Sequence, residues 1–384
     1  MKVAVLGYGT VGAGVYSMLS DAPGMEAGPV LVRPGKAVES FMVSDAALIF
    51  GDPTVDAVVE TLGGLDPAYS YGMRALEAGK HFITANKAMV AAHGLELAAL
   101  AREKGAAFLF SAACGGGVPF LHNLALSAET DRIEAVSGIL NGTTNYMLDA
   151  MQRRSLSYGD ALREAQSLGY AESDPTADVS GLDALRKMQL ACAVAFGVLP
   201  QSGMLCEGME HFTAADVEDI QSRGLVCRLM ARGSRAGESV SAYVEPVLFP
   251  RAAPESSVFT NNNMARYTGK RCGSIVLMGQ GAGRFPTASA VLRDLSAAQQ
   301  GARSMFPENC RAAEADNREA VHSYYIRTGG FAAVRLPLRS VLAQGEVVRA
   351  VTEPMSSEKM HALAQNIRKD GNDLFFAALE EELC

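Results

Sequence analysis

Four carboxylates lie within twelve residues near the middle of the chain: Glu172, Asp174, Asp178 and Asp183. A pair of cations, Arg186-Lys187, follows them. Unpaired carboxylates at this density repel one another, and a bound ammonium group would relieve that repulsion. The cluster therefore favours a site for an amino-acid ligand.

Some of these residues also have a purely structural interpretation. Asp174 precedes Pro175, which is typical of a helix N-cap followed by proline at the first helical position. Asp183 and Lys187 are spaced i, i+4 on one face of a predicted helix, so their side chains can touch. Spacing alone favours a surface ion pair between them, worth roughly 0.3–0.5 kcal/mol.

A glycine-rich turn stands at the start of the chain. Gly7-Tyr8-Gly9-Thr10-Val11-Gly12 matches G-x-G-x-x-G after the apolar run 2–6 and before a helical pattern. Gly7 permits the tight turn, Gly9 lets a pyrophosphate approach the backbone, and Gly12 lets helix and strand pack. The N–H groups at the helix start would hold the phosphates, although a merely structural glycine turn is the alternative. The predicted cofactor-binding residues here are Gly7, Gly9, Thr10, Val11 and Gly12.

The end of the second predicted strand bears on which nicotinamide cofactor would bind. It reads Val32-Arg33-Pro34-Gly35-Lys36, where NAD-binding proteins carry an acidic residue for the ribose 2'-hydroxyl. A 2'-phosphate would repel a carboxylate and pair with Arg33, and such a charge-assisted hydrogen bond contributes about 1.5–3 kcal/mol. We therefore favour NADP(H). NAD(H) stays open, because Arg33 as a solvated loop charge is the alternative.

The first part of the chain predicts the scaffold for this turn. Further apolar runs lie at 30–32, 57–59 and 82–84, with helix-like stretches such as 71–78 between them. Strands that alternate with helices form a parallel, doubly wound sheet of the α/β class. We expect a Rossmann-type NAD(P)-binding domain over residues 1–120, rejoined by residues 279–310. Lys87 follows a strand end, where such sheets place their ligand crevice, or else forms a helix-start ion pair.

The pattern changes after residue 120. Longer helices are predicted at 157–168 and 179–196, and strands around 240–248. We expect residues 121–278 to form an α+β catalytic and dimerisation domain. Residues 316–384 restart with Tyr324-Tyr325-Ile326, end in a helical stretch at 360–367, and predict a small C-terminal unit.

Composition excludes several classes of partner. The 384 residues carry a net charge of -8, which disfavours nucleic acid and anionic membranes because phosphate groups attract clustered Lys and Arg. Seven cysteines without a Cys-x-x-Cys pair indicate reduced thiols in a cytoplasm. No stretch approaches the roughly 18 uninterrupted apolar residues of a membrane span. We expect a cytoplasmic protein that acts on small molecules.

Several further motifs follow one another in an order that resembles the homoserine dehydrogenase family, over roughly residues 1–300. The matching runs are Val58-Val59-Glu60-Thr61-Leu62-Gly63-Gly64, Thr84-Ala85-Asn86-Lys87, Gly115-Gly116-Gly117-Val118-Pro119, Asn141-Gly142-Thr143-Thr144-Asn145-Tyr146, Gly169 to Asp178 with Gly181-Leu182-Asp183 and Arg186-Lys187, and Gly279 to Gly283 with Pro286-Thr287-Ala288. The resemblance implies an NAD(P)-dependent oxidoreductase acting on CH–OH. Its members interconvert L-aspartate 4-semialdehyde and L-homoserine in threonine and methionine biosynthesis.

The resemblance also assigns roles to residues. Lys187 matches the lysine taken as proton donor, Asp183 matches its partner, and Lys87 is a second catalytic lysine that also lies beside the cofactor. Glu172 would accept the substrate amino group. The remaining assignments are Asp178, Tyr170 and Thr143 to the substrate, and Thr61 and Gly283 to the cofactor.

The chain departs from the family pattern in places. Ser111 stands where the family has a glutamate of a monovalent-cation site, so we predict no metal. Gln280 replaces a proline, and the loop 21–44 is shorter than typical. The tail from Ser323 begins like a regulatory ACT domain, yet the turn and helix pattern expected next are poorly kept, so we expect a degenerate ACT-like remnant. Relatives are usually dimeric, which implies a homodimer.

Two alternatives stay open at this point. Another semialdehyde or amino-acid dehydrogenase could share the Rossmann start, but it would not need the constellation from Glu172 to Lys187. A catalytically silent NADP-binding regulator would fit the lost glutamate. Retention of both Lys87 and Lys187 argues against that regulator.

Overall fold

The computed structural model describes residues 1–333 and 335–380. The chain divides into two compact units, each built from separate stretches of sequence. Unit 1 comprises residues 1–133, 189–199 and 279–311. Unit 2 comprises residues 134–188, 200–278 and the described part of 312–384.

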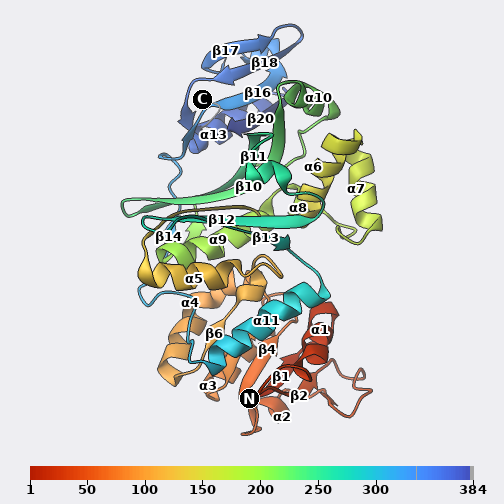
Figure 1. Ribbon diagram of the computed structural model, residues 1–384, viewed down its shortest axis with the longest axis vertical. Helices are drawn as coiled ribbons and strands as arrows, with labels where there is room; N and C mark the ends of the chain where they lie inside the picture. The colour runs from red at the N-terminus through yellow and green to blue at the C-terminus, as the bar shows by residue number, and fades with distance from the viewer. Residues whose placement is uncertain (334, 381–384) are drawn as a thin grey trace. The chain divides into compact units, whose positions relative to one another are not determined.

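Unit 1 is built on a six-stranded sheet in the order β3-β2-β1-β4-β5-β6. Strands β1, β2, β4 and β6 of this sheet are labelled in Figure 1. Every neighbouring pair is parallel, so the predicted doubly wound sheet is confirmed. Its strands are β1 (Lys2–Leu6), β2 (Glu26–Leu31), β3 (Met42–Val43), β4 (Ala57–Glu60), β5 (His81–Thr84) and β6 (Phe108–Leu109). The order reverses between β1 and β4, and ligands bind at such a switch point in open α/β sheets.

Helices cover both faces of this sheet. They are α1 (Thr10–Leu19), α2 (Ala47–Phe50), α3 (Ala68–Glu77), α4 (Lys87–Lys104), α5 (Phe120–Thr130) and α11 (Arg284–Gln299), with the 3-10 helix η1 (Ser111–Ala113). Helix α1 packs against α11, and α3 packs against α4. Right-handed crossovers in the two directions of the sheet put α1 and α3 on opposite faces. This double cover explains why the apolar runs 3–6 of β1 and 57–59 of β4 are fully buried.

Unit 2 is built on a ten-stranded mixed sheet in the order β13-β12-β7-β10-β11-β20-β16-β18-β17, with β9 paired to β11. Its strands are β7 (Ile133–Ile139), β9 (Leu205–Cys206), β10 (Leu225–Ala236), β11 (Ser239–Pro250), β12 (Asn262–Gly269), β13 (Gly273–Gln280), β16 (Tyr324–Gly329), β17 (Leu338–Ala343), β18 (Val347–Thr352) and β20 (Leu374–Leu379). Short strands outside it are β8 (Val198–Ser202), β14 (Arg311–Glu314), β15 (Val321–His322) and β19 (Met355–Ser356).

The helices of the middle of the chain correct one prediction. They are α6 (Gly142–Arg154), α7 (Tyr158–Ser167), α8 (Thr176–Val179), α9 (Leu182–Phe196) and α10 (Ala214–Ser222), with the 3-10 helix η2 (Pro254–Ser257). The single helix predicted over 179–196 is wrong at its start, because the chain breaks between α8 and α9. Gly181 has φ +83°, a left-handed conformation that a continuous right-handed helix cannot contain.

The C-terminal strands form a complete βαββαβ unit, the pattern of ferredoxin-like folds. Its elements are β16, α12 (Gly330–Ala333), β17, β18, α13 (Ser357–Lys369) and β20. The expected loss of pattern is limited to α12, which is a single turn. Strand β20 pairs in parallel with β11, and Tyr324, Phe376 and Val247 share one buried cluster. The C-terminal strands therefore continue the sheet and core of unit 2.

Two chemical properties of the described residues complete the fold. Six cysteines are thiols outside any disulfide, and Cys384 lies outside the described residues. Within the same residues, no helix has both the length and the apolar character needed to span a membrane.

Candidate active site

An ion pair between Asp183 and Lys187 stands at the start of α9. Asp183 Oδ2 lies 2.7 Å from Lys187 Nζ, as the i, i+4 spacing predicts. Only 12% of each side chain is exposed, so the pair is not the surface ion pair that spacing alone favoured. Lys187 Nζ also donates a hydrogen bond of 2.6 Å to the backbone carbonyl of Leu140, the residue after β7. The ammonium is thus aimed by two acceptors from different elements.

Asn141 joins this pair to a second carboxylate. Its Nδ2 donates to Asp178 Oδ1 at 2.7 Å and to Asp183 Oδ2 at 2.9 Å. Its Oδ1 accepts from the backbone N–H of Thr144 at 2.8 Å, which makes Asn141 the N-cap of α6. One amide therefore fixes the start of a helix and the spacing of two carboxylates.

The electrostatics of the cluster favour a cationic ligand. Burial and the nearby Asp183 charge raise the pKa of Asp178 above its ordinary value, while the hydrogen bond from Asn141 opposes that rise. Two carboxylates face one ammonium, so the cluster keeps an excess negative charge when both are ionised. A ligand ammonium next to Asp178 would neutralise that charge.

Of the remaining predicted substrate residues, Thr143 lies in the first turn of α6, and Tyr170 and Glu172 lie on the segment between α7 and α8. Thr143 Oγ1 donates to the backbone carbonyl of Tyr170 at 2.5 Å, and the Tyr170 ring meets Tyr146 edge-on at 5.1 Å. Glu172 is exposed on the same segment, and its backbone carbonyl accepts from Gln166. The start of α6 is therefore held to the segment that carries Glu172.

Asp174 has a structural role, although it is not the helix N-cap that the sequence offered as an alternative. Its Oδ1 accepts from the backbone N–H of Thr176 at 3.1 Å and from the Thr176 hydroxyl at 2.6 Å. The N-cap position of α8 is Pro175 rather than Asp174, so the predicted cap is displaced by one residue. These hydrogen bonds lower the pKa of the exposed Asp174. They place Asp174 in the turn before α8.

The glycine turn of unit 1 has the shape that a pyrophosphate needs. Gly7 has φ +100°, and a Cβ on Gly12 would lie 2.1 Å from the Gly7 carbonyl oxygen. A Cβ on Gly9, by contrast, would have no heavy atom within 4 Å. Thr61 Oγ1 donates to the Leu6 carbonyl at 3.0 Å and so ties the end of β4 to this turn. The backbone of the turn is therefore in tight contact where Gly12 meets Gly7, whereas the space beside Gly9 is free of protein atoms.

A buried carboxylate organises the neighbouring strand ends. Glu60 accepts from the backbone N–H of Leu62 at 2.6 Å and from Thr84 Oγ1 at 2.5 Å. Asn86 caps α4 by accepting from Met89, and Lys87 is the first residue of that helix. Lys87 therefore belongs to unit 1, on the same edge of the sheet as the glycine turn, because β1, β4 and β5 are parallel.

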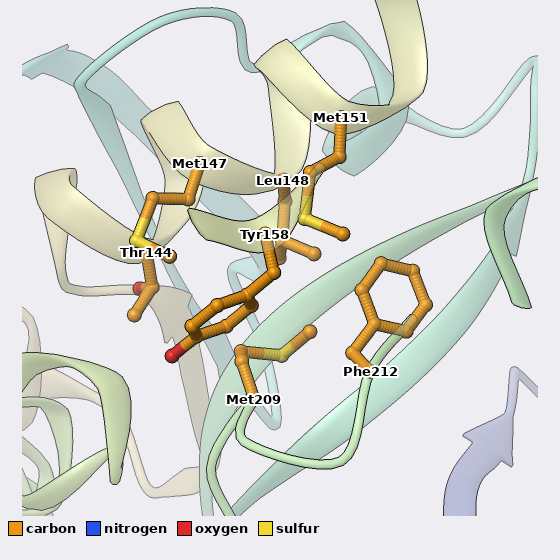
Figure 2. A pocket seen from close by; sticks show the side chains of 7 residues that line it. All are labelled: Thr144, Met147, Leu148, Met151, Tyr158, Met209 and Phe212. Carbon is orange, nitrogen blue, oxygen red and sulfur yellow. The ribbon is translucent and has the colours of Figure 1, made fainter. Parts of the chain in front are cut away.

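Unit 2 also contains a small apolar hollow behind α6, which has no room for a ligand. Figure 2 shows the methionines of α6 facing Met209 and Phe212 across it. Its lining residues are Thr144, Met147, Leu148, Met151, Tyr158, Met209 and Phe212. Without a charged side chain in the lining, it cannot recognise an amino acid, and we assign it to packing.

Two family models match consecutive parts of the chain. Residues 7–111 match the NAD-binding domain of homoserine dehydrogenase, and residues 119–296 match homoserine dehydrogenase itself. A homoserine dehydrogenase of Synechocystis is 37% identical over 319 residues, which are 77% of this chain and 72% of that protein. One from Corynebacterium glutamicum is 38% identical over 314 residues, 76% of this chain and 70% of that protein.

The chain belongs to the homoserine dehydrogenase family.

A solved structure agrees over nearly the whole length. The homoserine dehydrogenase of Thiobacillus denitrificans superposes with a TM-score of 0.87 at 29% identity, covering 99% of this chain and 98% of that one. The chain is therefore an NAD(P)-dependent oxidoreductase of the homoserine dehydrogenase family.

Ser111, where the resemblance led us to expect the family's cation-site glutamate, is hydrogen-bonded to Asp294. Ser111 Oγ donates a short hydrogen bond to one oxygen of Asp294, and its backbone N–H donates to the other at 2.8 Å. Burial raises the pKa of Asp294 to about 7. A neutral hydroxyl whose proton serves another residue does not replace a carboxylate ligand, so Ser111 does not fit a cation site.

Other predicted cofactor residues of this homoserine dehydrogenase lie on the surface of unit 1. Thr10 and Arg33 are exposed, and Val11 is half-buried in the first turn of α1. Gly283 is the N-cap of α11, with φ +119°. Sequence reasoning did not assign roles to Asn141, the Leu140 carbonyl or Glu60. Asn141 and Glu60 stand inside motifs that carry the family resemblance, and an uncharged amide or a carboxyl group at those positions was the only signal that the sequence offered.

Proposed function

We propose that this homoserine dehydrogenase reversibly reduces L-aspartate 4-semialdehyde to L-homoserine, in threonine and methionine biosynthesis. The observation that carries the proposal is the buried Asp183–Lys187 pair, which Asn141 links to Asp178. The comparisons favour this reaction over another amino-acid dehydrogenase or a catalytically silent regulator.

Lys187 is the proton donor in this proposal. A bound nicotinamide supplies the hydride that goes to the aldehyde carbon of the substrate. Lys187 Nζ gives one proton to the aldehyde oxygen, so the C=O bond becomes C–H and O–H. Asp183 favours the charged ammonium, which stabilises the negative charge that develops on oxygen. The Leu140 carbonyl accepts a second hydrogen bond from Nζ and so helps to fix its position.

The substrate ammonium is recognised by carboxylates in this proposal. Asp178 is half-buried beside Asn141, and Glu172 lies on the exposed segment that Thr143 holds through Tyr170. Charge-assisted hydrogen bonds to these groups would distinguish an aldehyde that carries an amino-acid ammonium group from a simple aldehyde. Lys87, at the start of α4, is assigned to the nicotinamide side of the site, where it binds substrate carboxylate or relays protons.

The residues of unit 1 fit a dinucleotide. The open side of Gly9 would admit a pyrophosphate. The proposal also assigns Gly7, Thr10, Val11, Gly12, Thr61 and Gly283 to the cofactor. We propose NADP(H) as the preferred cofactor, with Arg33 pairing the 2'-phosphate. Residues 1–120 with 279–310 form the cofactor-binding domain in this proposal, and residues 121–278 form the catalytic and dimerisation domain.

The proposal includes a homodimer in the cytoplasm. Strand β13 is the edge of the sheet of unit 2, and its Val276 and Met278 side chains are 43% and 60% exposed. Apolar side chains on an open edge favour a second copy as partner. Sedimentation velocity of the wild type against Met278→Lys tests this, and a wild-type monomer at micromolar concentration would contradict it. The C-terminal unit, residues 316–384, is assigned no effector.

The experiment is the oxidation of NADPH, followed at 340 nm, on addition of L-aspartate 4-semialdehyde. Lys187→Met should lower kcat by about 100-fold or more, while NADPH affinity stays unchanged. Arg186→Met, an exposed neighbour on the same helix, is the matched control and should keep kcat within about 2-fold. Near-normal turnover in Lys187→Met would remove Lys187 from the role.

The cofactor assignment is tested with the same assay. Arg33→Ala should raise KM for NADPH by about 10-fold and leave KM for NADH unchanged, since only the 2'-phosphate contact is lost. A wild-type preference for NADH would contradict NADP(H) without touching the role of Lys187.

A further inference from the structure

The turn from Leu205 to Met209 lies directly against the backbone that separates Asp178 from Asp183. The backbone N–H of Met209 donates to the Val179 carbonyl at 2.9 Å, and Cys206 Sγ donates to the Ser180 carbonyl at 3.0 Å. These two contacts hold the last carbonyl of α8 and the carbonyl of its C-cap residue, both directly before the break at Gly181. The positions of both carboxylates therefore depend on this turn.

The turn 205–209 and the segment 179–181 are in close contact, with no space between them for a further side-chain atom. A Cβ on Gly208 would lie 2.2 Å from the Val179 carbonyl oxygen, and a Cβ on Gly181 would lie 3.1 Å from Cys206 Sγ. Close-packed interiors transmit displacements because no gap absorbs them. A shift of the 205–209 turn must move the backbone next to Asp178.

The C-terminal unit holds the turn 205–209 through an ion pair. Glu207, which is buried, accepts from Arg368 Nη2 at 2.6 Å and from Nη1 at 2.9 Å. The same guanidinium donates to the Leu374 carbonyl, from Nε at 3.1 Å and from Nη2 at 2.7 Å. Arg368 stands in the last turn of α13 and Leu374 begins β20. A two-pronged ion pair of this kind fixes orientation as well as distance.

We propose that Arg368 is a positioning residue for the reaction. Through Glu207 it couples the C-terminal βαββαβ unit to the backbone at Val179–Gly181, and so to the spacing of Asp178 and Asp183. The inference rests on the proposed role of those carboxylates and of Lys187. It assigns the C-terminal unit a part in turnover that requires no effector.

Arg368→Met is the first test, because methionine keeps much of the apolar stem and removes the guanidinium. We expect kcat for the semialdehyde to fall by about 10- to 100-fold, the scale of small misplacements at a catalytic centre. The dissociation constant for NADPH, measured by fluorescence, should stay unchanged. Arg335→Met is the matched control, since Arg335 forms an exposed ion pair with Asp370 within the same C-terminal unit.

Alkylation of Cys206 gives a readout that needs no substrate. Burial raises the pKa of the Cys206 thiol to about 12, so it reacts slowly while the turn is closed. Peptide-resolved mass spectrometry with iodoacetamide should find Cys206 modified about 10-fold faster in Arg368→Met than in the wild type or in Arg335→Met. Arg368→Lys, which keeps the charge but makes one contact in place of the fork, should lie between them.

The outcomes separate the inference from the proposed function. Wild-type kcat and Cys206 reactivity in Arg368→Met would overturn the coupling, as would equal losses in Arg368→Met and Arg335→Met. If Arg368→Met fails to fold, Arg368→Lys decides by the same two readouts. Normal turnover in Lys187→Met would instead overturn the catalytic assignment, whatever the Cys206 rates are.

Discussion

At the scale of single residues, Asn141 does the most to define the active site. Its one NH₂ group serves two carboxylates, and its oxygen caps α6. Without it, Asp178 and Asp183 would face each other with Lys187 as their shared cation. The charged members of the cluster were evident from the sequence. The neutral side chain of Asn141 determines how the two carboxylates are arranged around Lys187.

Asn141→Ala should lower kcat/KM and also shift its pH dependence. The hydrogen bond from Asn141 lowers the pKa of Asp178, so removing it raises that pKa further. Asp178 then stays protonated to a higher pH, and the acid limb of the kcat/KM profile should move upward. The expected loss is about 100-fold at pH 6 and smaller at pH 8. Ser173→Ala, an exposed change on the neighbouring segment, should keep the wild-type profile, and an unmoved acid limb in Asn141→Ala would contradict the assignment.

Asp294 makes the stability of unit 1 depend on pH. Its pKa is raised to about 7 in the folded protein by burial, against about 3.9 in an unfolded chain. Between these values the folded state binds more protons than the unfolded state, so stability falls as pH rises from about 4 to 7 and stays lower above. Asp294→Asn keeps an acceptor for Ser111 and removes the titration.

The free energy of unfolding, measured in urea at pH 5 and pH 8, checks this prediction. Relative to the wild type, Asp294→Asn should gain about 2–3 kcal/mol between the two values. Asp21→Asn, on an exposed loop, should show no such gain. A constant difference between Asp294→Asn and the wild type would show that Asp294 does not titrate in this range.

At the scale of elements, the break between α8 and α9 lets Asp178 and Asp183 converge on one asparagine. In an uninterrupted helix, residues five apart lie about 140° apart around the axis and cannot share one partner easily. Gly181 makes the break by its left-handed φ, and Val244 and Cys206 pack against it. The loop 205–209 and strand β11 then hold the broken ends.

Gly181→Ala should destabilise unit 2 more than the same change at an open left-handed glycine. Both Gly181 and Gly169 have positive φ, which costs about 1–2 kcal/mol for alanine. A Cβ at Gly181 would also lie 3.0 Å from Val244 Cγ1, whereas at Gly169 nothing lies within 4 Å. Thermal denaturation should therefore place Gly181→Ala at least about 1 kcal/mol below Gly169→Ala. Equal stability of the two variants would mean that the packing around Gly181 yields freely.

At the scale of the whole molecule, the C-terminal unit shares a sheet and a core with the catalytic strands. Strand β20 pairs with β11, and Arg327 forms a buried ion pair of 2.7 Å with Asp216 of α10. Glu245 of β11 and His361 of α13 lie 3.1 Å apart in the interior. A unit attached this way is a permanent part of the fold rather than an appended module.

Deletion of the chain after Ala315 should therefore prevent folding of unit 2. It would expose the apolar face that Tyr324, Ile326 and Phe376 cover, and leave the buried Asp216 and Glu245 without their partners. We expect the shortened chain to be insoluble on expression, which fractionation and gel filtration would measure. A soluble, monodisperse shortened chain that still reduces the semialdehyde would contradict this, and would also weaken the proposed role of Arg368.

The sequence alone was enough to predict the sheet of unit 1, the family and one contact of the active site. The Rossmann sheet and the family were predicted from the glycine turn, from the alternation of short apolar runs with helices, and from the order of the motifs. These signals are local, because turn geometry and the spacing of apolar residues depend on neighbours in the sequence. The i, i+4 spacing of Asp183 and Lys187 likewise predicted their contact. Such features need only a few adjacent residues to be recognised.

Tertiary structure decided what joins distant segments. The sequence did not reveal that Asn141 bridges two carboxylates some forty residues away, that the Asp183–Lys187 pair is buried, or that β20 completes a sheet with β11. Burial and hydrogen bonding between remote segments depend on the packing of whole elements, since the same residue can be solvated or enclosed according to what folds over it. For that reason the charged groups of the site could be predicted from the sequence, whereas only the fold decided which of them share a hydrogen-bond partner.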